Sequence, residues 1–314
     1  MQNLMLSKKP GRRLSTGNKS VILYGGKSKG LRKGFFGSTM IKKVKAIVLR
    51  AAGINCDLET QFALELADAK AERIHINRLI ENKAMLSEYQ ILVFPGGFSY
   101  GDDVAAGKIM ANQVVNHLIE AVRKFIDDGK LVLGFCNGFQ VLVKAGLLPG
   151  SDSDVQPAAP GAAAATQNDE KDLTITYNDS GKYEDRWVYL QSQKTKSVFI
   201  EPDRQIYLPV AHGEGKIVVR NAEMLEKLKQ NNLIAFKYVD ERGQEGPFPI
   251  NPNGSIESIA GLVDATGRVM GMMPHPERFV RLTQHPRWTR LKDKTEADGM
   301  IIFNNAVKYV KEHF

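Results

Sequence analysis

The feature that most constrains the fold of this chain is an alternation of two kinds of pattern, which begins near residue 45. Strand-like apolar runs occur at 45–50, 72–77, 90–94 and 130–135. Segments with apolar residues at helical spacing lie between or after these runs, at 57–70, 108–128 and 138–145. This rhythm predicts an α/β fold with a doubly wound, mostly parallel sheet flanked by helices.

The second half of the chain is less regular and predicts added antiparallel strands. Its strand-like runs lie at 173–177, 186–190, 205–210, 216–220, 233–240, 256–264 and 268–273. The chain ends in an amphipathic pattern that predicts a helix, with Met300, Phe303, Val307 and Val310 on one stripe.

A sharp corner follows the strand-like run at 130–135. Cys136 stands there between Gly134 and Gly138, directly before a helical pattern. A strand that turns into a helix through Gly-x-nucleophile-x-Gly presents the central side chain above the sheet, beside free N–H groups that favour a thiolate. The alternative interpretation is a small buried hydrophobic residue, as free cysteines often are.

A histidine and a carboxylate follow the last predicted strand. His275 lies between two prolines, which exclude a regular helix, and Glu277 stands two residues later. Residues two apart in an extended segment point to the same side, so Glu277 can orient the imidazole as a partner for Cys136. The alternative for His275 is a residue that caps a loop.

A glycine turn follows the strand-like run at 90–94. Gly96 and Gly97 can expose backbone N–H groups, which with the N–H of Asn137 would form a two-donor oxyanion hole. A phosphate-binding role is weaker, since the chain contains neither a Walker motif nor G-x-G-x-x-G. Asp102 and Asp103 are interpreted as a solvated loop or a partner contact, and no metal site is expected.

Together, the motifs GFCNGFQ, PGG and HPE resemble those of the class I (triad) glutamine amidotransferases. The further stretches GINCDLET, PGGFSYGDD, PVAHGEG, NPNGS and IAGLVDATGRVMGMMPHPER are similar to the branch of that family that serves phosphoribosylformylglycinamidine synthase. The resemblance covers roughly 44–314. The first 40 residues have no counterpart in it, and the Ala/Pro-rich insertion replaces a shorter link.

The resemblance implies an activity and a set of roles. Cys136 would attack the side-chain amide of glutamine, His275 would transfer the proton and Glu277 would orient the imidazole. Gln140, together with the segment around His212, would hold the groups on the α-carbon of glutamine. The residues implied in substrate binding are Gly96, Gly97, Phe98, Asn137, Gln140, His212 and Gly213. Cys56, the second cysteine, is expected to be structural.

The resemblance also implies partners. Ammonia would pass to a large synthetase subunit, assisted by a small bridging subunit, that converts formylglycinamide ribonucleotide to formylglycinamidine ribonucleotide in purine biosynthesis. No cofactor is expected on this chain, and ATP and magnesium would belong to the partner. The alternatives are a triad amidotransferase serving another acceptor, a non-catalytic glutamine-binding module and a stand-alone cysteine hydrolase.

The charge of the chain is concentrated at one end. The net charge is +8, yet 1–43 contains eight lysines and three arginines and no acid, so the remainder is slightly acidic. Nucleic-acid binding by the folded part therefore loses its main support. The sequence predicts a disordered basic tail at 1–40 and one domain at 41–314, with a low-complexity insertion at 151–168.

Three explanations of the tail stay open: a non-native extension ahead of Met40, an organellar targeting peptide, or a basic arm that binds nucleic acid. Two cysteines are too few for a disulfide framework, which favours a reducing compartment. The expected location is the cytoplasm, with an organelle as the alternative. No apolar run approaches the roughly 20 residues that a membrane span needs.

Overall fold

The computed structural model describes residues 43–150, 172–291 and 294–314. The predicted basic tail at 1–40 and the predicted insertion at 151–168 lie outside these residues. Within the described ranges, no helix is both long enough and apolar enough to cross a bilayer.

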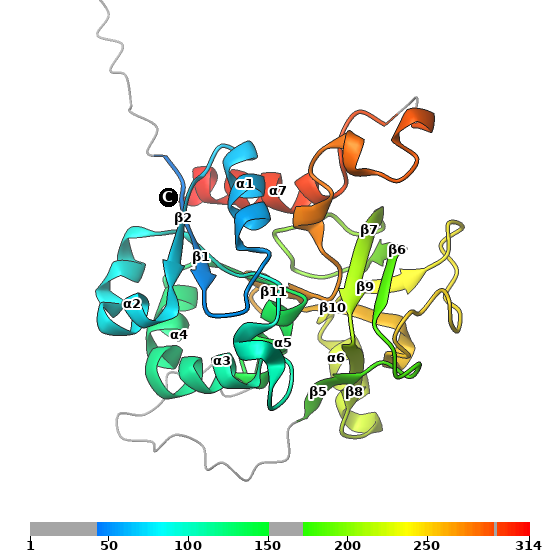
Figure 1. Cartoon of the computed structure of the whole chain (residues 1–314), viewed down its shortest axis with the longest axis horizontal. Helices are drawn as coiled ribbons and strands as arrows, with labels where there is room; N and C mark the ends of the chain where they lie inside the picture. The colour runs from blue at the N-terminus through cyan, green and yellow to red at the C-terminus, as the bar shows by residue number, and fades with distance from the viewer. Residues whose placement is uncertain (1–42, 151–171, 292–293) are drawn as a thin grey trace, which may run out of the picture. The chain divides into compact units, whose positions relative to one another are not determined.

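A nine-stranded sheet organises the fold, in the order β2-β1-β3-β4-β11-β10-β9-β6-β7 (Figure 1). Its first five strands pair in parallel. They are β2 (Lys70–His75), β1 (Lys45–Arg50), β3 (Ile91–Phe94), β4 (Leu131–Phe135) and β11 (Val269–Met272). The strand from the end of the chain, β11, thus lies beside β4, the strand that leads to Cys136.

The second half of the chain extends the same sheet with antiparallel strands. These are β10 (Ile259–Val263), β9 (Ile234–Val239), β6 (Glu184–Ser192) and β7 (Gln205–His212). A separate antiparallel pair is formed by β5 (Leu173–Tyr177) and β8 (Glu214–Val219). The parallel core with added antiparallel strands confirms the predicted fold class.

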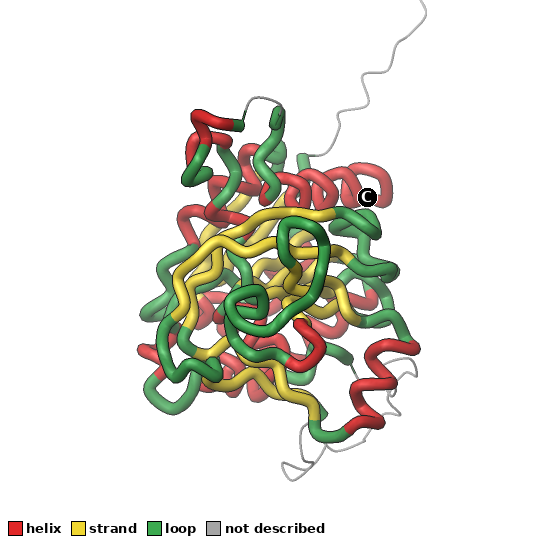
Figure 2. The backbone as a smooth tube through the Cα atoms, turned by 90° about the vertical axis from the view of Figure 1, so that its right-hand side faces the viewer, coloured by secondary structure: helices red, strands yellow, loops and turns green. Residues whose placement is uncertain are grey.

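Helices cover both faces of the parallel core (Figures 1 and 2). On one face lie α1 (Asp57–Leu66) and α7 (Gly299–His313). On the other lie α2 (Ile76–Glu81), α3 (Lys108–Gln113), α4 (Ile119–Asp127) and α5 (Asn137–Lys144), and α6 (Ala222–Gln230) packs in the same cluster. The predicted stripe on the last helix is confirmed, since Met300, Phe303, Val307 and Val310 are all buried.

Because helices cover both faces of the parallel sheet, its strands have continuous apolar sequences. In β1, Ala46 and Val48 point into one core cluster, whereas Ile47 and Leu49 point into the other. A strand buried on both faces needs apolar residues at every position.

The predicted single helix at 108–128 is wrong in its middle. A π-helical turn at Val114–Leu118 separates α3 from α4. A π turn adds a residue to the helical repeat and rotates the next helical segment about the axis. Here it keeps Val114, Leu118 and Val122 all within the core, with exposed fractions of 1% or less.

Two helices were not predicted, α2 and α6. The sequence carried a start signal for α6, since the side chain of Asn221 accepts a hydrogen bond from the N–H of Met224. Short 3-10 turns occur at Lys83–Glu88, Ser99–Asp102, Ile256–Ser258, Pro276–Arg278, Leu282–Gln284 and Trp288–Arg290.

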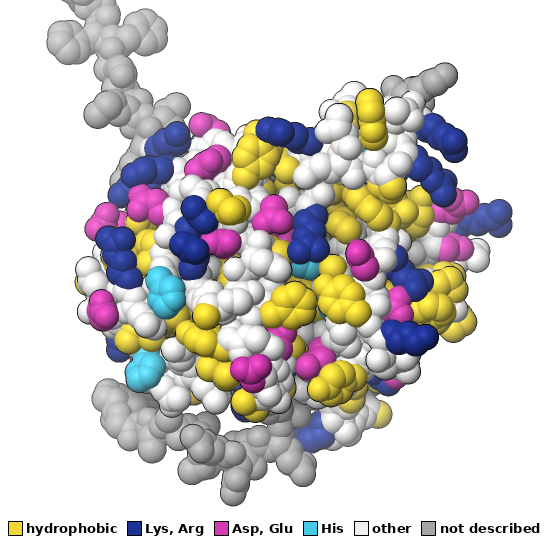
Figure 3. All heavy atoms as spheres, viewed as in Figure 1, with side chains coloured by type: hydrophobic (Ala, Val, Ile, Leu, Met, Phe, Trp, Pro, Cys, Tyr) yellow, Lys and Arg dark blue, Asp and Glu magenta, His cyan; other side chains and the backbone are white. Residues whose placement is uncertain are grey.

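The face shown in Figure 3 carries basic and acidic side chains interspersed, with neither sign forming a continuous area. A nucleic-acid interface needs a concentrated basic surface. This face therefore offers no support for nucleic-acid binding.

Candidate active site

Cys136 occupies the corner between β4 and α5. Its φ of 49° and ψ of −106° lie outside the regions that ordinary residues adopt. The corner is tied to the neighbouring strand, because the N–H of Cys136 donates to the carbonyl of Met272 at 2.8 Å. The residue is 5% exposed, and its Sγ lies 3.7 Å from the carbonyl oxygen of Ala211.

The two glycines that flank Cys136 are required by close packing. A Cβ on Gly138 would stand 1.8 Å from the carbonyl oxygen of Phe94. A Cβ on Gly134 would stand 2.6 Å from Cδ1 of Leu142 and 2.8 Å from the Gly138 carbonyl oxygen. The first turn of α5 can therefore press against β3 and β4 only without side chains at these positions.

We predict that Gly138→Ala destabilises the protein by about 3 kcal/mol, because the added methyl group must push the backbone of Phe94 aside. The melting temperature should fall by roughly 10 °C. Gly213→Ala is the matched control, since its methyl group would meet only the ring of Tyr183 at 3.8 Å. Equal melting temperatures for the two variants would contradict this explanation of the glycine.

His275 follows β11 and reaches the corner from the adjacent strand. Its backbone is extended, with φ −106° and ψ 90°, and its N–H donates to the carbonyl of Pro209 at 2.9 Å. Nδ1 of the ring lies 2.6 Å from Oε1 of Glu277, and both side chains are buried. Nε2 of His275 and Oε2 of Glu277 have no hydrogen-bond partner.

The electrostatic surroundings favour a charged imidazole. Burial alone would lower the pKa of His275, but the negative charge of Glu277 and that of Cys136 more than offset this and raise the pKa well above its ordinary value. The structure thus brings Cys136, His275 and Glu277 together in one buried group.

The glycine turn lies beside this group. A Cβ on Gly96 would stand 2.7 Å from Cε1 of His275. The N–H of Phe98 donates to the Gly53 carbonyl at 3.0 Å, whereas in the part of the chain described here the N–H of Gly97 donates to no backbone carbonyl. Asn137 begins α5, where an N–H has no partner within the helix. The two donors expected for an oxyanion are therefore available.

The side chains of Asn137 and Gln140 hold the base of the site together. Nδ2 of Asn137 donates to Asp102 Oδ1 at 3.0 Å and to Gln140 Oε1 at 3.1 Å, and its Oδ1 accepts from the N–H of Ser99 at 3.4 Å. Nε2 of Gln140 donates to the carbonyl of Glu214 at 2.5 Å. Gln140, expected to hold the α-carbon groups of glutamine, is therefore buried and engaged within the protein.

Asp102 is not a solvated loop residue, which was one of the two interpretations that the sequence suggested. Its carboxylate accepts hydrogen bonds from the N–H of Gly107 and from Asn137, and burial raises its pKa. Tyr100 and Asp102 both adopt positive φ, at 57° and 54°, which few residues other than glycine do. The neighbouring Asp103 is exposed. The loop is thus anchored to the residue that follows the nucleophile.

His212 and Gly213 lie at the end of β7. His212 is buried, with Nδ1 3.1 Å from Asn178 Oδ1 and Nε2 without a partner. Burial, with the charge of His275, lowers the pKa of His212 to about 3, so the ring is neutral. Gly213 lies next to Tyr183.

Tyr183 and Phe98 form an exposed aromatic pair at the site. Their ring centroids are 6.4 Å apart with an interplanar angle of 28°. The pKa of Tyr183 is raised by burial and by the charge of Cys136 and lowered by His275 and Arg278, with the net direction upward. Phe98 directly follows Gly97, and the ring of Tyr183 lies beside Gly213, so the pair forms a rim of the active site.

The sequence analysis missed the surroundings of Cys56. This residue is fully buried, and its Sγ lies 4.0 Å from Nδ1 of His275 and 3.1 Å from Nη2 of Arg278. Burial raises the pKa of the Cys56 thiol. The motif GINCD gave no indication that this cysteine would pack against the histidine, because the contact is made only in the folded chain.

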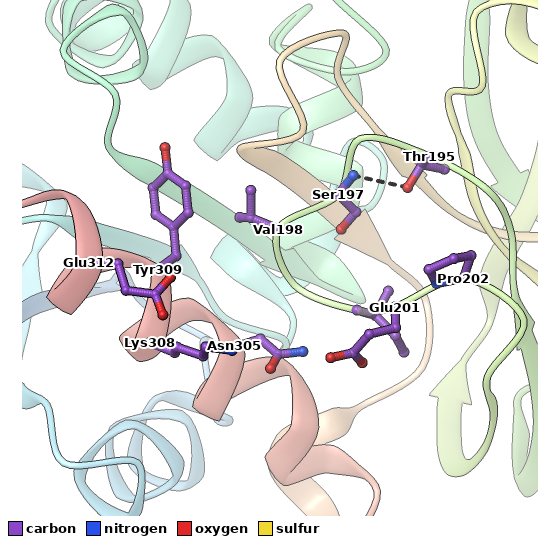
Figure 4. Close-up of a pocket in the computed structure, with 10 residues that line it drawn as sticks. Thr195, Ser197, Val198, Glu201, Pro202, Asn305, Lys308, Tyr309 and Glu312 are labelled. Atoms are coloured by element: carbon purple, nitrogen blue, oxygen red, sulfur yellow. Dashed lines mark hydrogen bonds between the residues drawn. The ribbon is translucent and has the colours of Figure 1, made fainter.

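Possible ligand atoms of Cys56, His275 and Glu277 lie within 4.8 Å of one another. The donor set does not suit a cation, because the guanidinium of Arg278 already contacts the sulfur and the histidine and glutamate bond directly to each other. A surface hollow elsewhere, between the loop at 195–202 and α7, contains none of these residues (Figure 4). We therefore assign catalysis to the corner at Cys136 and not to that hollow.

Comparisons with known proteins show matches over most of the chain. Residues 43–310 match the family described as CobB/CobQ-like glutamine amidotransferase domain. The chain is 44% identical over 274 residues to phosphoribosylformylglycinamidine synthase subunit PurQ of Dehalococcoides mccartyi, covering 87% of this chain and 100% of the relative. It is 39% identical over 283 residues to the subunit of the same name from Methanococcus maripaludis, covering 86% and 99%. The structure of PurLQS from Thermotoga maritima is similar, with a TM-score of 0.61, 27% identity and coverage of 86% and 100%.

Proposed function

The chain belongs to the CobB/CobQ-like glutamine amidotransferase family, and from that membership we propose that it is the glutaminase subunit of a phosphoribosylformylglycinamidine synthase. It hydrolyses glutamine to glutamate and supplies the ammonia to a synthetase subunit in purine biosynthesis. The observation that carries this proposal is the 44% identity to a PurQ subunit over that relative's whole length. The grouping of Cys136, His275 and Glu277 supplies the chemistry.

In the first half-reaction, Sγ of Cys136 attacks the side-chain amide carbon of glutamine. His275 holds the proton of the thiol, and the amide oxygen becomes an oxyanion that accepts hydrogen bonds from the N–H groups of Gly97 and Asn137. The carbon–nitrogen bond then breaks. The leaving nitrogen takes the proton from His275 and departs as ammonia, which leaves a γ-glutamyl thioester on Cys136.

In the second half-reaction, water attacks the thioester. His275 accepts a proton from the water and returns it to the sulfur as the carbon–sulfur bond breaks, which releases glutamate and restores Cys136. Glu277 holds Nδ1 of the ring through the 2.6 Å contact, so Nε2 is the nitrogen that exchanges protons with the sulfur. The raised pKa of His275 favours the charged ring, which supplies the proton that the leaving nitrogen takes.

The partners follow from the same family membership. The related PurQ chain occurs in a structure named PurLQS, and this chain works with the corresponding large synthetase subunit and small bridging subunit. We assign ATP and magnesium to the synthetase subunit, with no cofactor on this chain, and we place the complex in the cytoplasm. With ATP chemistry on the synthetase subunit, the site at Cys136 catalyses only the release of ammonia from glutamine.

The test is a glutaminase assay of the purified chain, alone and with its cognate large and small subunits. With formylglycinamide ribonucleotide, ATP and magnesium present, glutamine should support formation of formylglycinamidine ribonucleotide, and glutamate should appear in equal amount. Free ammonium should replace glutamine as nitrogen donor for the synthetase subunit alone. Glutamate release that never couples to this acceptor, but couples to a guanylate or carbamoyl phosphate synthase, would overturn the proposal.

A further inference from the structure

The two N–H donors assigned to the oxyanion come from separate segments of the chain. Gly97 belongs to the turn that follows β3, whereas Asn137 is the first residue of α5. Groups that stabilise a transition state must be held within about 0.5 Å of their productive positions. The two segments therefore need a connection that fixes one donor relative to the other.

The side chain of Asn137 provides such a connection. Its Oδ1 accepts a hydrogen bond at 3.4 Å from the N–H of Ser99, which stands two residues after Gly97. Asn137 and Ser99 are each only 1% exposed, so this bond lies within the protein and away from bulk water. The residue that supplies one donor is thus bonded through its side chain to the segment that supplies the other.

Asp102 determines which way the amide of Asn137 faces. A carboxylate only accepts hydrogen bonds, so the amide nitrogen must face Oδ1 of Asp102, which lies 3.0 Å away. The amide oxygen is then turned toward the N–H of Ser99. Gln140 favours the same orientation, because its Nε2 donates to the carbonyl of Glu214 and its Oε1 is left to accept from Asn137.

The loop that carries Asp102 is itself constrained. Oδ1 of Asp102 also accepts from the N–H of Gly107 at 3.1 Å, which closes the loop over 102–107. Tyr100, Gly101 and Asp102 all have positive φ, at 57°, 73° and 54°. Residues other than glycine rarely adopt such a backbone, which persists only where the surrounding contacts hold it. This constrained loop presents the carboxylate to Asn137 at the base of the active site.

We propose that Asp102 is a positioning residue of the oxyanion hole, an inference that rests on the proposed function. Asp102 fixes the amide of Asn137, and that amide keeps the N–H groups of Gly97 and Asn137 aimed at one point. An oxyanion forms in both half-reactions, when sulfur attacks the amide and when water attacks the thioester. A loss of alignment therefore slows both steps, whereas the binding of glutamine before the reaction is little changed.

The experiment measures glutamate release by the assembled complex and, separately, alkylation of Cys136 by iodoacetamide. Asp102→Ala should lower kcat by about 10- to 100-fold, less than the loss of a whole donor, with KM within about threefold of the wild type. The alkylation rate should stay within about twofold, because attack of sulfur on a saturated carbon forms no oxyanion. Asp102→Asn should recover part of kcat, since its amide oxygen can still accept from Asn137 and Gly107.

A double-mutant cycle tests whether Asp102 acts through the amide. Asn137→Ala keeps the backbone N–H and removes the side-chain connection, so it should show the same loss of kcat at an unchanged alkylation rate. Adding Asp102→Ala to Asn137→Ala should then lower kcat by less than about twofold more. Asp103→Ala is the matched control, because it removes an exposed carboxylate one residue later and should leave kcat unchanged.

Three outcomes would overturn the inference. An unchanged kcat in Asp102→Ala would do so, and an unchanged kcat in Asn137→Ala would do so even if Asp102→Ala did not fold. Equal losses of kcat and of alkylation rate would mean that Asp102 supports the corner as a whole. Losses that multiply in the double variant would mean that Asp102 acts by another route. A wild-type complex that releases no glutamate would overturn the proposed function itself, and this inference with it.

Discussion

Cys136→Ala is expected to lower glutamate release from glutamine by about 10⁴-fold or more. Both half-reactions pass through a bond to its sulfur, and Cys56, the other thiol near His275, is fully buried. The substitution removes one atom and leaves Gly134 and Gly138 in place, so the fold should persist. Glutamate release by the complex and the melting temperature of the chain are the two measurements.

The second cysteine serves as an internal control for this variant. Cys56 is fully buried, whereas Cys136 stands at the corner beside the exposed rim. Iodoacetamide should therefore label the wild type once, at Cys136, and glutamine should protect it. Cys136→Ala should remain unlabelled. Substantial glutamate release by this variant, at an unchanged melting temperature, would refute the assignment of the nucleophile.

His275→Ala is expected to lower kcat by about 10³-fold, because general acid–base transfer by a positioned side chain contributes roughly that much. Glu277→Gln should cost less, about 10- to 100-fold. It keeps a hydrogen-bonding group of the same size next to Nδ1 and loses only the charge. Steady-state kinetics of the three proteins with glutamine will establish the order. A larger loss in Glu277→Gln than in His275→Ala would contradict the roles assigned here.

The contact between His275 and Glu277 also predicts how the pH dependence of kcat changes in Glu277→Gln. Glu277 is the main group that raises the pKa of His275. The charged ring is present below that pKa and is lost as the pH rises through it. Removing the charge in Glu277→Gln lowers the pKa, so the alkaline limb of kcat should move to lower pH. A limb that stays in place or moves upward would show that Glu277 does not control the protonation of the ring.

Much of the fold follows from the local pattern. Strands β1 and β5 begin and end where the apolar runs do, since residues buried on one or both faces must be apolar. The predicted boundaries of elements were wrong where a side-chain hydrogen bond ends one element and begins the next within an apolar run. The run at 72–77 predicts a strand, yet the strand ends at His75, whose ring accepts the N–H of Asn77 and starts α2. Likewise, the π turn between α3 and α4 could not be predicted from the local pattern, because it depends on how these two helices pack against the core.

The catalytic group was predictable for a related reason. Cys136 and His275 stand in backbone contexts, the glycine corner and the double proline, that are visible in a few consecutive residues. Arg278 and Cys56 give no such sign. Their relation is a contact between segments far apart in the sequence, and it exists only once the sheet is assembled. The same holds for the side chain of Asn137, which connects the loop at Asp102 to Gln140.

The pairing of β11 with β4 has a consequence for the biosynthesis of the protein. The strand that leads to Cys136 ends at Phe135, whereas its neighbour, which leads to His275, begins at Val269 and is therefore translated much later. A nascent or prematurely terminated polypeptide would therefore carry the thiol without its acid–base partner. Wasteful loss of glutamine and untimely release of ammonia would be avoided until the segment that carries His275 has been translated.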